Sequence, residues 1–169
     1  MSQFPALLAG QRMTAAVAAQ MLPYWAQKIG PTGRASTTTL ADDPDLILAL
    51  PGAGTFTFEL FLNYTGGTLG SSDLKMAMVY SGSSSYGVWA VNGVNTTSTA
   101  QVNMGGNGTG TAGTITVGTS GGTFLTVDIK GELVATSAGN LSLQWAQNTS
   151  NATATNLRQG CWMRVTQIA

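Results

Sequence analysis

The sequence predicts an all-β protein, an antiparallel β-sandwich of the jelly-roll kind that is preceded by a short N-terminal helical arm. All five prolines lie in the first 51 of the 169 residues. Proline lacks the backbone N–H that a central strand must donate, so the long proline-free remainder suits a sheet. In that remainder, apolar and polar residues alternate in short runs separated by glycine, serine and asparagine. This period of two is typical of half-buried strands in a sandwich.

Residues 1–35 are expected to form the arm, and residues 36–169 the sandwich domain. Thr14–Leu22 is rich in alanine, with Thr14 as a possible N-cap and Pro23 as its end, so it predicts a helix. A helix this short is marginal alone and needs a surface to pack on. The apolar residues of the arm are Phe4, Leu7, Leu8, Met13, Val17 and Met21.

About eight short strands are expected in the sandwich domain. The clearest alternation covers residues 55–64, 74–80, 125–130, 141–146 and 161–168, with shorter candidates at 37–40, 46–50, 87–91 and 114–117. The glycine-rich stretch 105–122 predicts a long loop or a thin hairpin, and Asn92-Gly93 and Asn107-Gly108 are turn dipeptides. The residues expected in the core or at a subunit interface are Phe56, Phe58, Leu60, Leu62, Leu141, Leu143, Trp145 and Trp162.

Charge is scarce and unevenly placed. Charged residues make up 8% of the chain and sum to zero, against about a quarter in an ordinary soluble domain. Zero net charge excludes nucleic-acid binding through a basic surface. Residues 76–127 contain no charge at all, which is easier to understand if subunits share much of that surface. Phe61 and Val79, apolar residues on the outer side of their strands, also suggest a subunit contact.

Membrane and secretion signals are not expected. The first residues lack the basic segment of a signal peptide. The most apolar helical stretch, 14–26, is interrupted by Gln20 and Pro23 and is too short to span a bilayer.

The residues that most catalysis needs are scarce. The chain has no histidine, which excludes a Ser-His-Asp or Cys-His arrangement and the usual zinc sites. Gly108–Gly113 matches the dinucleotide fingerprint, but the strand-like Thr114–Val117 follows it where a helix must begin. Cys161 is interpreted as a small half-buried hydrophobic residue rather than a nucleophile. We therefore expect no enzyme activity and no cofactor.

A cluster of aspartates has two interpretations. Asp42, Asp43 and Asp45 surround Pro44 and could together bind calcium. A solvated turn before the strand at Leu46 is favoured, because the spacing lacks the glycine and the distal glutamate of a calcium loop. We expect no metal site.

Aromatic residues leave a glycan option open. Tyr86 and Trp89 lie close together in the uncharged block, and exposed aromatic rings on a sandwich can stack on sugars. Tryptophans at alternating strand positions are more often core or interface residues. The pair is kept as a possible glycan contact.

Both ends of the chain resemble small virion proteins from phages of actinobacteria. The resemblance covers residues 131–165, with the run Ala138–Thr155, and the opening around Phe4–Ala6, Gly10–Ala15 and Met21–Pro23; Arg34–Thr39 and Asp42–Leu46 continue it. The glycine-rich middle carries little of it. Where such proteins tend to have Gly-Ser before the last tryptophan, this chain has Gly160-Cys161.

The resemblance implies a structural protein of the virion, either a minor tail protein or a capsid-decorating protein. Of these positions we expect the capsid surface, with assembly in the host cytoplasm. By analogy with trimeric jelly rolls of the C1q/tumour-necrosis-factor type, we expect a homotrimer. The arm would bind the major capsid protein, and the trimer would stabilise the particle. The alternative is a minor tail protein, bound to tail proteins, with a glycan-binding or host-adhesion role.

Overall fold

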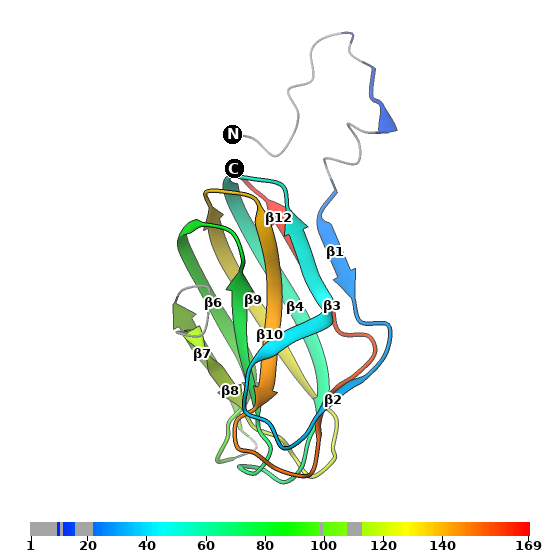
Figure 1. Cartoon of the computed structure of the whole chain (residues 1–169), viewed down its shortest axis with the longest axis vertical. Helices are drawn as coiled ribbons and strands as arrows, with labels where there is room; N and C mark the ends of the chain where they lie inside the picture. The colour runs from blue at the N-terminus through cyan, green and yellow to red at the C-terminus, as the bar shows by residue number, and fades with distance from the viewer. Residues whose placement is uncertain (1–9, 11, 16–21, 99, 108–112) are drawn as a thin grey trace.

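The structure is a computed structural model that describes residues 10, 12–15, 22–98, 100–107 and 113–169. It shows two antiparallel sheets packed face to face (Figure 1), which confirms the predicted all-β sandwich. The two sheets hold eight and four strands within the described residues.

The larger sheet follows the order β1-β12-β4-β9-β6-β7, and β11 joins β2 to the end of β4. Its strands are β1 (Tyr24–Gln27), β2 (Thr32–Arg34), β4 (Gly54–Thr65), β6 (Ser84–Val94), β7 (Gln101–Asn107), β9 (Leu125–Ala135), β11 (Thr155–Leu157) and β12 (Trp162–Gln167). The smaller sheet follows the order β3-β10-β5-β8. Its strands are β3 (Ala41–Leu50), β5 (Leu74–Tyr80), β8 (Ile115–Val117) and β10 (Gly139–Gln147).

The pairing pattern is that of a jelly roll. β3 pairs with β10, β4 with β9, β5 with β8, and β6 with β7. These nested pairs form one long antiparallel hairpin, rolled so that it contributes strands to both sheets in turn. β7 and β8 therefore end their two sheets as edge strands.

The core lies between the sheets and comes from the alternating residues. Phe56, Phe58, Leu60 and Leu62 point inward from β4, and none is more than 2% exposed. Leu141, Leu143 and Trp145 face them from β10 and are completely buried. These seven residues are core residues of the single chain. At about 1.5–3 kcal/mol for each large side chain, their burial drives the two sheets together.

Trp162 lies on the outer face of the larger sheet instead. Its ring stacks on Trp25 of β1 at a centroid distance of 5.0 Å and on Phe61 of β4 at 6.4 Å. We call these three residues the aromatic row. Trp25 is 51% exposed, so the row remains open to solvent at its outer end.

The sandwich begins earlier in the chain than expected. Tyr24–Gln27 pairs with β12, and Thr32–Arg34 pairs with β11, so both segments belong to the larger sheet and not to an arm that ends at residue 35. Of the predicted helix at 14–22, residues 16–21 lie outside the described part of the chain. The helical arm thus remains a prediction.

Two local predictions in the sandwich are wrong. Residues 37–40 form no strand. Asn92-Gly93 lies inside β6, and the chain turns toward β7 only after it, from Asn95 on. There the Asn95 side chain accepts a hydrogen bond from the backbone N–H of Thr97 at 2.8 Å. Asparagine makes such a turn without glycine.

Candidate functional site

The clearest polar arrangement in the structure is built on β3. Pro44 stands inside this strand, which is possible because β3 is the edge of the smaller sheet. The register against β10 shifts opposite it, between Ser142 and Gln144. This irregularity turns Asp43 inward, where it is completely buried.

Lys28 meets Asp43 in the interior. Its ammonium Nζ lies 2.9 Å and 3.0 Å from the two carboxylate oxygens of Asp43 and 3.2 Å from Oδ2 of Asp45. Both Lys28 and Asp43 are completely buried, while Asp45 is 24% exposed. Lys28 comes from the segment after β1, whose backbone is held by hydrogen bonds to Cys161 and Gly160.

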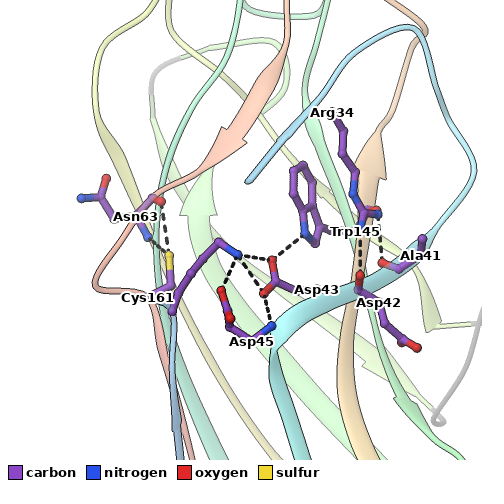
Figure 2. A network of polar contacts seen from close by, with 9 residues as sticks. Arg34, Ala41, Asp42, Asp43, Asp45, Asn63, Trp145 and Cys161 are labelled. Carbon is purple, nitrogen blue, oxygen red and sulfur yellow. Dashed lines mark hydrogen bonds and ion pairs between the residues drawn. The ribbon is translucent and has the colours of Figure 1, made fainter. Parts of the chain in front are cut away.

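The carboxylate of Asp43 accepts further hydrogen bonds. The indole N–H of Trp145 donates to it at 3.1 Å, and the backbone N–H of Asp45 donates at 3.1 Å. Figure 2 shows Asp43 between Asp45 and the Trp145 indole. Every charged group of the cluster is therefore paired, which is the condition for burying charge at acceptable cost.

Arg34 extends this network to the surface. Its guanidinium donates to the backbone carbonyls of Ala41 at 2.9 Å, Asp42 at 2.8 Å and Trp145. It also lies over the Trp145 ring, 4.4 Å from the centroid. Partial burial lowers the pKa of Arg34, and the charges of Asp43 and Asp42 oppose that shift.

This arrangement fastens the first strands to the sandwich. Asp43 has no free lone pair directed at solvent and so offers no accessible base. The expected solvated turn at Asp42, Asp43 and Asp45 is wrong for Asp43, because Lys28 supplies the partner that burial requires. Over the described residues, no group of three or more acidic, cysteine or histidine side chains could hold a metal ion.

The sequence reasoning missed Lys28 and Arg34. The available signal was the small number of cationic residues. The chain has four arginines and three lysines, and two of the lysines follow residue 74. A cation for an aspartate cluster near residue 43 had few possible sources.

The structure does not bring together Tyr86 and Trp89, the two residues of the predicted glycan contact. Tyr86 is 52% exposed, whereas Trp89 is 1% exposed and belongs to the core. Positions three apart on a strand lie on opposite faces. Trp89 therefore cannot stack on a sugar, and this part of the prediction is wrong.

The remaining predicted sites are located as follows. Met13 is 55% exposed; the other attachment residues, Phe4, Leu7, Leu8, Val17 and Met21, lie outside the described part. Cys161 is fully buried rather than half-buried, and burial raises the pKa of its thiol. Its Sγ accepts a hydrogen bond from the Asn63 backbone N–H at 3.2 Å.

Comparisons with known proteins leave the function to be argued from the structure. No protein-family model and no curated protein sequence matches the chain. Among the described residues, no helix has the length and apolar character needed to cross a membrane.

Proposed function

We propose that the chain is a structural protein of a phage virion, a capsid-decoration or head-fibre protein that binds the particle through its N-terminal arm. One observation carries the proposal. The sandwich closes its core with residues from Tyr24 onward, yet the large apolar residues described before it, Met13 and Leu22, are 55% and 65% exposed. Apolar side chains that the sandwich does not use are available to bind a partner.

The direction of the chain favours attachment at one end. β1 runs antiparallel to β12, from Tyr24 beside Val165 to Gln27 beside Trp162. The chain therefore enters β1 at the end of the sandwich where β12 leads to the C-terminus (Figure 1). An arm bound to the capsid would leave the opposite end projecting outward. The resemblance to virion proteins at both ends of the chain supports the same proposal.

A trimer is part of the proposal, and the uncharged edges of the sandwich support it. β7 and β8 are edge strands, and both lie in the block 76–127 that lacks charge. Soluble proteins usually protect such edges with charged residues, because unpaired strands bind other strands. Contact between copies along this side would explain why protection is absent here.

The proposed role is binding and not catalysis. The buried carboxylate of Asp43 is saturated by Lys28, Trp145 and backbone, and that saturation suits a structural network. Mechanical stabilisation of a particle needs apolar contacts and repeated copies. Each buried arm side chain would contribute about 1.5–3 kcal/mol, multiplied by three in a trimer.

A truncation tests the arm directly. A chain that lacks residues 1–21 should remain folded but should not bind phage particles. The particles are those of the phage that encodes the protein, produced without it. The cut stops at 21 because a deletion to residue 30 would remove β1 and Lys28. Binding is measured by co-sedimentation, and electron microscopy of particles with the full chain locates it on capsid or tail.

The outcomes separate the candidates. Particle binding by the truncated chain at full-length affinity would contradict attachment through the arm. Density at the tail and not on the capsid would favour the alternative, a minor tail protein with a host-adhesion role. That alternative no longer draws support from Trp89, and only Tyr86 of its predicted residues is exposed.

A further inference from the structure

A pocket of about 570 Å³ opens at the end of the sandwich away from the C-terminus. Its walls include Gln27 of β1, Asn63 of β4, Phe124 before β9, and Arg158, Gln159 and Gly160 between β11 and β12. The C-terminal end is marked by Thr55, whose N–H donates to the Ala169 carbonyl at 2.8 Å. Asn63 stands eight residues further along the same strand, which at about 3.4 Å per residue is about 27 Å away.

The wall formed by residues 158–160 is held in place by the backbone. The N–H of Arg158 donates to the Asn63 carbonyl at 2.8 Å, and the N–H of Gly160 donates to Lys28 at 3.1 Å. Gly160 has a φ of +90°, a conformation that favours glycine and lets the chain reverse before β12. The pocket wall is therefore built on the sheet and does not depend on a free loop.

The charge of the pocket comes from one group. Arg158 is exposed, and its guanidinium lies 4.5 Å above the ring of Phe124, which is itself 59% exposed. The ion pairs of the described residues are Lys28 with Asp43 and Asp45, and Arg164 with Glu59; Arg158 takes part in none of them. A single unpaired guanidinium matches one carboxylate.

Side-chain amides supply the neutral polar groups. Gln27, Asn63 and Gln159 each offer one carbonyl acceptor and two N–H donors. The Oδ1 atom of Asn63 is shielded from solvent and has no hydrogen-bond partner among the described residues. Figure 2 shows its carboxamide directed away from the Asp43 network. An unpaired buried acceptor is destabilising, and rotation of the amide toward a hydroxyl donor of a bound ligand would give it a partner.

Apolar rings complete the surroundings. Phe124 is the aromatic residue among the pocket walls. The aromatic row lies on the same sheet next to two other wall residues, because Gln27 pairs with Trp162 and Asn63 lies two residues beyond Phe61 on β4. Rings beside convergent amides suit a ligand with C–H faces and hydroxyl groups. A volume between about 300 and 1,000 Å³ is the usual size of a small-molecule site.

We infer that this pocket binds an acidic saccharide, with Arg158 contacting its carboxylate, Phe124 stacking on a pyranose through the ring face opposite Arg158, and Gln27, Asn63 and Gln159 hydrogen-bonding its hydroxyl groups. A phosphate-rich polymer fits poorly, because it would need several cations where the pocket has one. The inference is independent of the proposed virion attachment. If both hold, the pocket lies at the outward end of the anchored protein, where a host-surface saccharide could reach it.

The test is a titration of the full chain with a uronic-acid trisaccharide and, separately, with its carboxyl-reduced, neutral counterpart. Calorimetry and tryptophan fluorescence measure the affinity for each. The acidic saccharide should bind at least tenfold more tightly than the neutral one. Arg158→Gln should weaken binding of the acidic saccharide by tenfold or more, so that the acidic and neutral saccharides bind it equally. Phe124→Ala should weaken both by tenfold or more.

Tyr86→Ala is the matched control, because Tyr86 is an exposed aromatic residue on β6, outside the pocket. Its binding should equal that of the unmodified chain. Thermal unfolding of all three variants checks that they are folded, which is expected since each altered side chain is exposed. No binding of either saccharide, equal binding of both, or undiminished preference in Arg158→Gln would overturn the inference. None of these results would alter particle attachment.

Discussion

At the scale of single residues, the cluster of Lys28 and Asp43 shows how a chain with little charge uses the charge it has. Both side chains are completely buried and 2.9 Å apart. Removing water from two ions is expensive, so such a pair is weak evidence for net stabilisation. The pair instead holds strands in position. Asp43 accepts hydrogen bonds from Lys28, Trp145 and the Asp45 backbone at once, and these bonds fix β3 against β10 and against the segment after β1.

Breaking this pair on one side should destabilise the protein strongly. Lys28→Met leaves the Asp43 carboxylate buried without its cation, and we expect a loss of about 3–5 kcal/mol. Urea unfolding followed by tryptophan fluorescence measures it. Lys130→Met, at an exposed lysine on β9, should change stability by less than about 0.5 kcal/mol. Equal stability of the two variants would show that the buried pair contributes nothing.

Buried hydroxyl and thiol groups make the free energy of unfolding depend on pH in the alkaline range. Burial raises the pKa of Cys161 above its ordinary 9.0, and those of Tyr64 and Tyr80 above 10.0. The unfolded chain releases these protons at lower pH than the folded one. The stabilisation is therefore complete below about pH 9 and is lost as pH rises through the folded-state values.

Tyr64→Phe tests this dependence. Tyr64 is buried and donates to the Gly118 carbonyl at 2.6 Å, so the variant should be less stable at neutral pH by about 1–3 kcal/mol, because that carbonyl loses its partner. The fall in its urea midpoint above pH 10 should be shallower than in the unmodified chain. Parallel pH profiles for the two proteins would rule out a contribution from Tyr64.

At the scale of elements, β4 and β9 illustrate how close packing restricts a strand. The two are paired over eleven residues, from Gly54 with Ala135 to Tyr64 with Leu125. Phe58 faces Gly131 in this ladder, and its ring fills the space that a side chain at 131 would take. A glycine inside a strand often marks such a close approach.

Gly131→Ala should therefore be destabilising although alanine is small. The added Cβ would overlap the Phe58 ring and lie 2.6 Å from the Val88 carbonyl oxygen. We expect a loss of about 1–3 kcal/mol from overpacking. Gly52→Ala is the control, because nothing lies within 4 Å of a Cβ there. Urea unfolding of both variants measures the difference in stability. A Gly131→Ala variant as stable as Gly52→Ala would mean that β6 and Phe58 can move apart.

At the scale of the whole molecule, the nested hairpin places the uncharged block on one side of the sandwich. β6, β7 and β8 all derive from residues 76–127. The pocket at Asn63 and Arg158 lies toward β1 and β12, at the other side of the larger sheet. Assembly along the uncharged edges would thus leave the pocket accessible.

Analytical ultracentrifugation tests the trimer. The full chain should sediment as a trimer at micromolar concentration, and a charged edge should dissociate it. Gln101→Lys with Asn103→Lys, at two exposed positions of β7, should give monomers by like-charge repulsion. Thr136→Lys, exposed outside this edge, should leave the trimer intact. A monomeric unmodified chain would end the trimer proposal.

Much of the fold could be predicted because its signal is local. Alternation in residues 55–64 and 141–146 indicates which side chains face inward, and Phe56, Phe58, Leu141 and Trp145 are buried as predicted. The same reasoning failed at Tyr24–Gln27, because four residues after a proline carry too short a pattern to show a strand. It failed at Asn92-Gly93, because pairing with β7 and β9 on both sides keeps the dipeptide within β6.

The sequence by itself determined the class of fold, the inward-facing residues of β4 and β10, and the absence of histidine chemistry, since each follows from composition or a period of two. Only the tertiary structure decided that Asp43 is buried against Lys28, that Trp89 faces the core while Tyr86 faces out, and that Asn63, Phe124 and Arg158 line one pocket. Those facts depend on register and on partners far apart in the chain; Asp43 alone contacts Lys28, 15 residues away, and Trp145, 102 residues away. Local sequence does not encode such distances; the pairing of the sheets does.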